Sequence, residues 1–447
     1  MNFPTAFENR VKNDSFLGND LLTALNENPP VSLRLNSLKQ IDQKQLSDLQ
    51  FDKQIAWCEN AFYLKERPIF TLDPLFHAGC YYPQEAGSMV LDKILRSLTL
   101  PDQPIVLDLC AAPGGKSTLI SSFLNEKGLL VSNEVIRNRA QILKENLTKW
   151  GATNVVVTNN DPKDFERLPH FFDVVVCDAP CSGEGMFRKD FNSRNEWSES
   201  NVELCAGRQK RIVSDVWESL KPNGFFIYST CTFNEQENEK NVQFICEQLG
   251  ADLIKIELQP TLKKGRNEYG NYCLPNLVNT EGFFIAVLQK YDDSKAKTKF
   301  ENKKEFKQVE AKTMGISDFT KEQNIQFFQW NDLILAFPQS SSQEILHLIA
   351  KLHIVKAGTT IGDLTRKGVN PHHELALNQH LCHYTQRLEL TREQALGYLH
   401  GDTFSLDGTH GFQLITFKQQ PLGWIKHLGN RFNNLYPKEW RIRMKID

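Results

Sequence analysis

Two apolar runs of the sequence each end in a short polar signature that contains a cysteine. Residues 172–181 read FDVVVCDAPC, and residues 225–231 read FFIYSTC. Apolar runs of this length predict buried strands. Asp178, Cys181 and Cys231 would then lie beyond the carboxyl ends of two strands, where open α/β sheets bind their ligands. Because a thiolate is the strongest side-chain nucleophile, the two cysteines predict a reactive site.

Strands and helices alternate on both sides of this stretch. The predicted strands lie at residues 105–110, 129–133, 154–158, 172–177 and 225–230, and residues 253–258 and 283–288 close the sheet. The predicted helices lie at residues 117–125, 137–150, 202–220 and 235–249. Such alternation is typical of a mostly parallel, doubly wound sheet. We therefore expect an α/β, Rossmann-like domain at residues 79–291.

The rest of the chain divides into smaller units. We expect an α+β domain at residues 1–78, a lysine-rich linker at 292–312, a small α/β domain at 313–385 and a β-rich domain at 386–447. The first unit carries predicted strands at residues 31–36, 55–57 and 62–64. Arg34 and Asn36 on its first strand are interpreted as solvated positions, with contact to a phosphate or a base as the alternative.

The composition is that of a globular protein. Hydrophobic residues make up 40% of the chain and charged residues 24%. The net charge of −2 neither favours nor excludes nucleic acid, because one face of a neutral protein can be basic. No signal peptide follows Met1, and no apolar run reaches the roughly 18 residues that span a bilayer. The ten cysteines include no CxxC pair, so we expect no disulfides and no metal, and a reduced, cytoplasmic protein.

A Gly-rich loop, CAAPGGKS at residues 110–117, follows the first predicted strand. Its small residues let backbone N–H groups approach a ligand at the start of a helix. It is not a phosphate-cradling GxxxxGK[ST] loop, because Cys110 stands where that motif needs Gly and Pro113 has no N–H. The dinucleotide fingerprint GxGxxG is also absent. The loop therefore predicts a cofactor without a pyrophosphate.

Acidic residues follow the next two strands. Glu134 ends the second strand, 19 residues past Gly115, where a carboxylate can accept both hydroxyls of a ribose. Asp161 follows the third strand, where it could accept from an adenine amino group. Either carboxylate could instead be a turn former or a helix cap. Together with the loop they indicate an adenosine-containing cofactor, and S-adenosyl-L-methionine fits best.

The paired cysteines suit an attack on a pyrimidine. Carbon 5 of a pyrimidine is a poor nucleophile, but a thiolate that adds to carbon 6 makes carbon 5 able to take a methyl group. A base then removes the proton from carbon 5 and the thiol leaves. Asp178 could hydrogen-bond the exocyclic amine and N3 of a cytosine. The alternative is that a cysteine only fills the core; this is our interpretation of Cys58, Cys110, Cys177 and Cys246.

Three long motifs resemble those of a known family. DLCAAPGGKS at residues 108–117, DAPCSGEG at 178–185 and STCT at 229–232 are similar to motifs of the NOL1/NOP2/Sun family of RNA cytosine-5 methyltransferases, and GCYYPQE at 79–85 agrees. The resemblance covers about residues 30–290 and implies a class I methyltransferase fold with S-adenosyl-L-methionine as cofactor. The overall layout resembles the bacterial branch that modifies 16S rRNA near the decoding site, which implies RNA-binding terminal domains, the last of them PUA-like.

The resemblance also implies a role for each motif residue. Cys231 is the expected nucleophile, and Cys181 is expected to help release the product. The residues alone do not rank the two thiols, since DNA cytosine-5 methyltransferases attack with the cysteine of the Pro-Cys motif. The expected cofactor-binding residues are Cys110, Ala111, Ala112, Pro113, Gly114, Gly115, Lys116, Glu134, Asp161 and Asp178.

The C-terminal sequence agrees with an RNA substrate. Residues 421–447 carry six Lys or Arg against two acidic residues. Four aromatic residues are interleaved with them, and could either stack on unpaired bases or form the core of a small barrel: Trp424, Phe432, Tyr436 and Trp440. Three nearby histidines do not indicate a metal, because they have no Cys or supporting partner: His372, His373 and His380.

These observations predict a monomeric RNA methyltransferase that uses S-adenosyl-L-methionine. We expect it to modify carbon 5 of cytosine in 16S rRNA, within the 30S subunit. The alternatives are a tRNA substrate, or an RNA-binding assembly factor that keeps the pocket without turnover.

Overall fold

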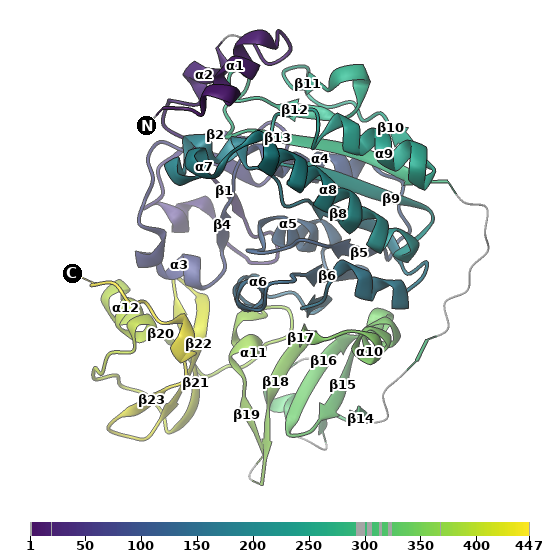
Figure 1. The fold of residues 1–447 in the computed structure, drawn as a ribbon. Helices are drawn as coiled ribbons and strands as arrows, with labels where there is room; N and C mark the ends of the chain where they lie inside the picture. The colour runs from purple at the N-terminus through teal and green to yellow at the C-terminus, as the bar shows by residue number, and fades with distance from the viewer. Residues whose placement is uncertain are drawn as a thin grey trace.

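A ten-stranded sheet lies at the centre of the computed structural model (Figure 1). The structure describes residues 2–18, 20–291, 300–301, 306–312, 315–320, 324–366 and 368–446. The five middle strands are parallel, in the order β9-β8-β5-β6-β7. They are β5 (Ile105–Asp108), β6 (Leu129–Asn133), β7 (Val155–Thr158), β8 (Phe172–Asp178) and β9 (Leu220–Thr230). The predicted α/β fold with a doubly wound, mostly parallel sheet is confirmed.

Antiparallel strands extend the sheet at both edges. Beyond β9 lie β13 (Phe283–Lys290), β10 (Ala251–Ile254), β12 (Asn271–Cys273) and β11 (Lys263–Lys264). At the other edge, β17 (Ile354–Ala357) pairs antiparallel with β7. β17 belongs to the segment after residue 312, so the C-terminal part of the chain completes the central sheet.

Helices cover both faces of the sheet because its strands are apolar on both sides. Val174 and Val176 of β8 face one helical layer, and Val175 and Cys177 face the other. The first layer holds α4 (Val90–Ser97), α5 (Gly115–Leu124) and α6 (Arg137–Trp150). The second layer holds α8 (Glu199–Val216), α9 (Glu239–Leu249) and α10 (Ser342–Lys351). Each fully buried Val or Leu contributes about 1.5–3 kcal/mol, so this double burial fixes the strand ends firmly.

A four-stranded sheet, ordered β2-β3-β1-β4, forms the N-terminal region. Its strands are β1 (Val31–Leu35), β2 (Phe51–Gln54), β3 (Ala61–Leu64) and β4 (Tyr81–Pro83), accompanied by α1 (Thr5–Asn13), α2 (Leu21–Ala24) and α3 (Pro74–His77). The strand predicted at residues 55–57 is wrong. The chain leaves β2 at Gln54 and turns, so Ile55 and Trp57 are buried as turn residues.

Two further sheets follow the central domain. One contains β14 (Lys307–Val309), β15 (Ile325–Trp330), β16 (Leu333–Pro338), β18 (Thr359–Thr365) and β19 (Gly368–Pro371), with α11 (His373–Leu377) beside it. The other contains β20 (Arg387–Glu389), β21 (Gly411–Phe417), β22 (Gln420–His427) and β23 (Phe432–Asn434), with α12 (Arg392–His400). Of the predicted linker at 292–312, residues 292–299 and 302–305 lie outside the described residues.

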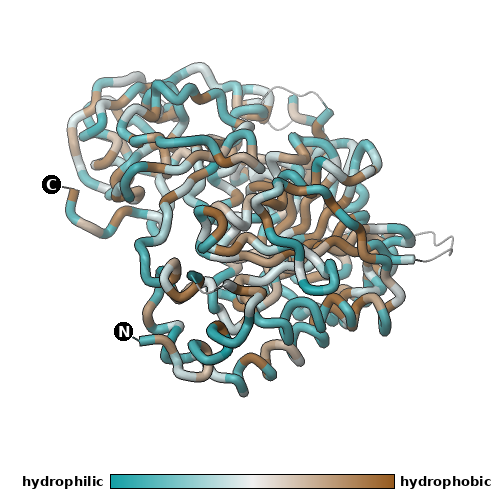
Figure 2. Tube along the Cα trace, turned by 90° about the horizontal axis from the view of Figure 1, so that it is seen from above, coloured by the Kyte–Doolittle hydropathy of each residue, from teal (hydrophilic) through white to brown (hydrophobic). Residues whose placement is uncertain are grey.

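The first and last parts of the chain pack together. Leu33 and Leu75 of the N-terminal region share one buried cluster with Leu396 and Leu399 of α12. Figure 1 shows α3 and α12 side by side, although they are more than 300 residues apart in sequence. Hydrophobic segments run through the interior and hydrophilic ones predominate at the periphery (Figure 2). In the described part of the chain, no helix combines the length and apolar character needed to cross a bilayer.

Candidate active site

The two cysteines of the sequence motifs meet beyond the ends of neighbouring strands. β8 and β9 are parallel, with Asp178 paired to Ser229, so the segments that follow leave the sheet at the same edge. They bring the Sγ atoms of Cys181 and Cys231 to 3.1 Å from each other. Both cysteines are free and only partly buried. The predicted pairing of two thiols and a carboxylate at one sheet edge is therefore a feature of the structure.

The Cys181 thiol holds its proton firmly. The hydrogen bond to Cys231, together with burial and the charge of a Cys231 thiolate, raises the pKa of Cys181 well above its usual range. Cys181 therefore stays a thiol, and its S–H can donate to the sulfur of Cys231. A thiol of this kind stabilises a thiolate beside it.

Asp178 makes one contact through each carboxylate oxygen. Its Oδ2 accepts from Lys116 Nζ at 2.7 Å, and its Oδ1 accepts from Ser229 Oγ at 2.9 Å. Burial lowers the pKa of Lys116, but the charge of Asp178 and this hydrogen bond raise it further, so the net shift is upward. Lys116 is thus a cation held against an ionised Asp178. Because each oxygen has a second lone pair, the carboxylate can also accept from a ligand.

The Gly-rich loop forms one wall of a cavity of about 190 Å³ next to Asp178. Gly114 has φ +119°, a conformation that suits glycine, and Cβ on Gly115 would come to 3.4 Å from the Tyr82 ring. Six predicted loop residues line the cavity, together with Asp178 and residues 82–85 and 88: Cys110, Ala111, Ala112, Pro113, Gly115 and Lys116. Gly114 does not line it and lies behind, facing Leu143.

Glu134 and Asp161 follow β6 and β7 but do not line this cavity. Glu134 is buried, accepts from the Ile136 backbone N–H at 2.9 Å and pairs with Arg139 at 3.3 Å. Asp161 is 45% exposed and caps the 3₁₀ helix Pro162–Arg167 by accepting from Lys163 N–H. Asp161 thus caps a helix, whereas Glu134 stabilises the turn before α6. Their order along the strand ends would nevertheless expose both to an extended ligand that crosses the sheet edge.

A buried carboxyl behind the loop tests whether a cofactor fits. Asp108 is fully buried, and its Oδ2 accepts from Ser117 Oγ at 2.6 Å while its Oδ1 has no partner. Burial raises the pKa of Asp108 to about 7. Buried acceptors are normally satisfied, so the unpaired oxygen suits a ligand with N–H or O–H donors. The acidic and small residues at this edge therefore fit an adenosine-containing cofactor.

Sequence reasoning missed several residues of the site. Ser229 bonds to Asp178, and Glu237 bonds to the backbone N–H of Ser182, next to Cys181. Tyr82 and Gln84 line the cavity from β4 and from the residue that follows it. Their only signal was a place inside or beside the quoted motifs, because hydrogen bonds between separate strands leave no pattern in the sequence.

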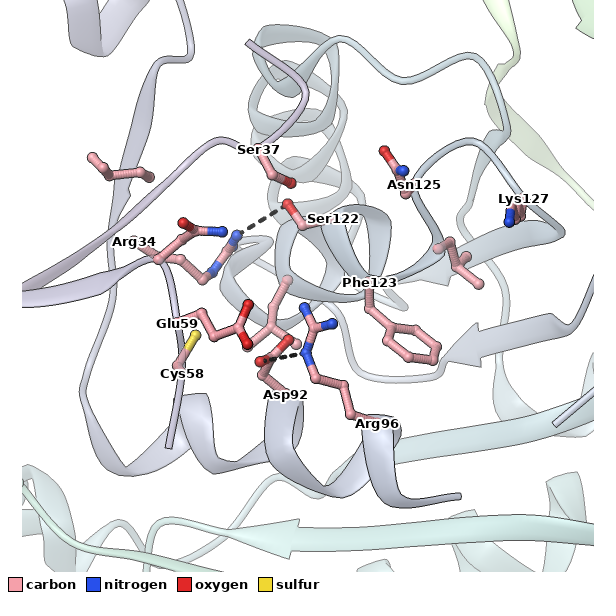
Figure 3. Close-up of a pocket in the computed structure, with 14 residues that line it drawn as sticks. Arg34, Ser37, Cys58, Glu59, Asp92, Arg96, Ser122, Phe123, Asn125 and Lys127 are labelled. Atoms are coloured by element: carbon pink, nitrogen blue, oxygen red, sulfur yellow. Dashed lines mark hydrogen bonds and ion pairs between the residues drawn. The ribbon is translucent and has the colours of Figure 1, made fainter. Parts of the chain in front are cut away.

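Arg34 corrects one expectation (Figure 3). It was interpreted as a solvated strand position, but it is only 2% exposed. Its guanidinium donates to Thr118 Oγ1 at 2.6 Å, to Gly115 O at 3.4 Å and to Ser122 Oγ at 3.4 Å. Asn36 is buried too, and donates to backbone oxygens of Gly79 and Trp150. Both side chains join the N-terminal sheet to the central domain, because a strand that packs on α5 cannot leave them in solvent.

A polar cavity of about 400 Å³ lies beside Arg34, and Figure 3 shows the residues that line it. Asp92 and Arg96 of α4 form an ion pair of 2.9 Å at its wall, and Asn125 and Lys127 lie at the C-terminal end of α5. The cavity contains none of the predicted site residues. It lies along α5 toward the end opposite the Gly-rich loop, so the smaller cavity, which the loop lines, is the better candidate for the cofactor.

The C-terminal aromatic residues divide between two roles. Trp424 and Tyr436 are buried core residues, whereas Phe432 and Trp440 are partly exposed. His373 is buried and packs edge-on against Tyr436 and Trp440. Over the residues that the structure describes, no group of three or more His, Cys, Asp or Glu side chains is arranged to hold a metal.

Family models match three parts of the chain. Residues 3–86 match the N-terminal domain of 16S rRNA methyltransferase RsmF, residues 95–289 match 16S rRNA methyltransferase RsmB/F, and residues 385–442 match the methyltransferase RsmF PUA domain. A solved methyltransferase homolog from Pyrococcus horikoshii is 26% identical with a TM-score of 0.54, covering 64% of this chain and 99% of that one.

Whole proteins of the same layout are also similar. Ribosomal RNA small subunit methyltransferase F of Shewanella loihica is 31% identical, over 93% of this chain and 90% of that protein. The protein of the same name from Escherichia coli is 30% identical, over 98% and 96%. The similarity therefore extends over nearly the full length of both relatives, from the N-terminal sheet to the PUA domain. The chain belongs to the family of ribosomal RNA small subunit methyltransferases F.

Proposed function

We propose that the protein methylates carbon 5 of cytosine in 16S rRNA near the decoding site, through a bond between Cys231 and carbon 6. The observation that carries this proposal is the 3.1 Å approach of the Cys181 and Cys231 sulfur atoms beside Asp178. Addition to a pyrimidine needs a thiolate, a second group that handles protons, and a group that grips the base. The three side chains supply these functions at one sheet edge.

The cofactor is S-adenosyl-L-methionine, which supplies an electrophilic methyl group when bound. We propose that the loop of residues 110–116 lies against its methionine part, with Glu134 at the ribose and Asp161 at the adenine. On binding, Glu134 and Asp161 would give up their present hydrogen bonds from backbone N–H groups and accept from the ligand's hydroxyl and amino groups instead. Asp178 borders both the cofactor cavity and the thiol pair, so it belongs to both sets.

In the proposed reaction Cys231 attacks carbon 6 of the cytosine as a thiolate, which the S–H of Cys181 stabilises. Asp178 accepts from the exocyclic amine, and from N3 when N3 carries a proton, and Lys116 and Ser229 keep its carboxylate in place. Carbon 5, now enamine-like, could then take the methyl group that the cofactor supplies, with S-adenosyl-L-homocysteine as the leaving group, and would give its proton to a base. The bond to Cys231 breaks, its electron pair returns to sulfur, and the hydrogen bond from Cys181 favours this departure.

The flanking domains support an RNA substrate. We propose the divisions 1–78, 79–291, 292–312, 313–385 and 386–447, with the first and last units in contact with RNA. The basic residues of the PUA-like unit and its partly exposed Phe432 and Trp440 suit single-stranded RNA. We further propose that the protein acts as a monomer in the cytoplasm, on 16S rRNA within the 30S subunit.

Methyl transfer from radiolabelled cofactor tests the proposal. Purified protein is offered 30S subunits, free 16S rRNA and tRNA, each from cells that lack the protein, and the modified site is located by bisulfite sequencing. The proposal predicts 5-methylcytosine in 16S rRNA of the 30S sample. If only tRNA were labelled, tRNA rather than 16S rRNA would be the substrate. If no sample were labelled, the result would favour an RNA-binding protein without catalytic activity.

A further inference from the structure

A buried carboxylate that the proposed mechanism does not use lies between the two catalytic loops. Glu237 has no exposed surface and follows Cys231 by six residues. The loops start from different strands, Cys181 after β8 and Cys231 after β9. Loop residues are ordinarily mobile, yet a reacting pair of thiols must keep a fixed separation. Some part of the structure must therefore join the loops.

Glu237 holds the loop of Cys181 on both sides of the cysteine. The backbone N–H of Ser182 donates to Glu237 Oε2 at 3.0 Å and to Oε1 at 3.3 Å. Gln209 Nε2 donates to Glu237 Oε2 at 2.7 Å and to Pro180 O at 3.1 Å. The residues immediately before and after Cys181 are thus tied, directly or through Gln209, to one carboxylate.

The same carboxylate holds the loop of Cys231. Asn234 Nδ2 donates to Glu237 Oε1 at 2.7 Å and to Thr232 Oγ1 at 2.8 Å, and Asn234 Oδ1 accepts from Glu237 N–H at 2.9 Å. The hydroxyls of Ser182 and Thr232 lie 3.1 Å apart and close the connection between the loops. One buried side chain therefore sets the position of both thiols.

Burial raises the pKa of Glu237, whereas its hydrogen bonds with Ser182 and Asn234 act in the opposite direction and favour the ionised form. Every hydrogen bond to its two oxygens comes from an N–H donor, so a proton on the carboxyl would face another donor. Gln209 turns its amide hydrogens to Glu237 because its oxygen accepts from Tyr228 and Asn241. Within the described residues, Glu237 has no ion pair, whereas its neighbour Glu184 pairs with Arg10 at 2.8 Å.

An uncompensated negative charge acts on the nearest thiol. A buried anion disfavours a second anion beside it, so Glu237 favours the thiol form of Cys181. This agrees with the upward pKa shift of Cys181, to which the hydrogen bond with Cys231, burial and the charge of Glu237 all contribute. The other titratable or charged groups that face this pair are Cys231, Glu184, Cys205, Arg208 and Tyr228.

We infer that Glu237 is a positioning residue: its carboxylate joins the two catalytic loops, and its charge keeps the proton on Cys181. The inference rests on the proposed function for the meaning of these roles. It names a residue that acts through both cysteines and touches neither substrate nor cofactor.

Thiol alkylation of the full-length protein, without RNA or cofactor, tests the inference. Iodoacetamide labels Cys181 and Cys231 across a pH series, and mass spectrometry reads each site separately. In Glu237→Gln, which removes the charge and keeps the size, Cys181 should react about tenfold faster at pH 8, and its profile should move to lower pH. An unchanged Cys181 profile in folded Glu237→Gln would overturn the inference.

Two matched variants separate charge from packing. Gln209→Ala loosens the same loop but keeps the charge, and Glu237→Asp keeps the charge on a shorter side chain. The Cys181 profile should stay at its wild-type position in both variants, while methyl transfer slows. If the pH profile of Cys181 alkylation shifted in either variant, packing rather than charge would set that profile. This comparison tests the inference even if Glu237→Gln does not fold. If the wild type transfers no methyl group, the proposed function fails, whereas the alkylation result stands by itself.

Discussion

At Cys181 and Cys231 the chemistry depends on which sulfur keeps a proton. The 3.1 Å contact and the upward pKa shift of Cys181 agree with the proposal that Cys181 keeps its proton and Cys231 attacks. The sequence alone predicted the pair and the carboxylate of Asp178 but did not rank the thiols. Ranking needed the family resemblance first and the three-dimensional contact second, because a proton's place depends on neighbours far apart in sequence.

Asp178 can be tested against a matched control, because β8 carries a second ion pair between an aspartate and a lysine at its other end. Asp178→Asn removes the charge that pairs with Lys116, so methyl transfer should fall by about 10²–10⁴-fold with little change in unfolding temperature. Asp173 pairs with Lys221 at 2.9 Å, remote from the site, so Asp173→Asn should keep its rate. Equal rate losses in the two variants would remove the special role of Asp178.

Asp108 gives a pH dependence with a defined sign. Burial raises its pKa to about 7, above the value of about 4 in an unfolded chain. The folded state therefore binds the proton more tightly, and this carboxyl lowers the unfolding free energy as pH rises from about 4 to 7. In Asp108→Asn that loss should disappear, so urea unfolding between pH 5 and 7.5 should show a shallower decline than in the wild type. Parallel curves would contradict the assignment.

The strands and helices that carry the site could be read from the sequence where burial follows a simple pattern. β5, β6, β7, β8 and the second half of β9 are mostly apolar because helices cover both faces, and α6 was predicted at its observed bounds, with Gly151 ending it in a left-handed conformation. β17 could not be predicted as a strand of the central sheet. It has only four residues, and its place is defined by its pairing with β7. In that pairing Ile354 lies opposite Thr158, which is 196 residues earlier in the chain.

The attachment of β17 depends on a buried ion pair. Lys356 Nζ of β17 lies 2.6 Å from Glu374 Oε2 of α11, and both side chains are almost fully buried. Burial raises the pKa of Glu374, but the charge of Lys356 outweighs it and lowers the pKa to about 2. Glu374→Gln would leave Lys356 buried without a counter-charge, so the unfolding free energy should fall by about 3–5 kcal/mol.

A surface ion pair provides the control for that change. Lys351 and Glu301 lie 2.8 Å apart, with Glu301 63% exposed, so solvent screens the pair. Glu301→Gln should leave the unfolding temperature unchanged. If Glu374→Gln were as harmless, the buried pair would not hold β17 in place.

The whole molecule is joined by a core that its two ends share. Leucines of the N-terminal region and of α12 belong to one buried cluster, and β17 inserts C-terminal sequence into the central sheet. The units were defined by the sequence pattern of each segment. In the structure, however, these contacts join one unit to another. Such contacts between distant segments leave no local pattern, so the arrangement of the units could not be derived from the sequence.

Cooperative unfolding should follow from the shared core. Leu75→Ala in α3 and Leu399→Ala in α12 each remove a buried side chain from it, at a cost of about 2–5 kcal/mol. Each should lower the temperature of the same calorimetric transition. Leu204→Ala, at a position 73% exposed on α8, should have no effect. Separate transitions, with only one shifted by each variant, would show that the terminal regions unfold independently.

The covalent step is tested by trapping the protein on its RNA. Cys181→Ala and Cys231→Ala are each incubated with S-adenosyl-L-methionine and 30S subunits that lack the modification, and then run on denaturing gels. Cys181→Ala should accumulate a protein–RNA adduct that survives denaturation, because attack proceeds while release is slowed. Cys231→Ala should form no adduct and transfer no methyl group. An adduct in Cys231→Ala, with none in Cys181→Ala, would contradict the assignment of Cys231 as the nucleophile.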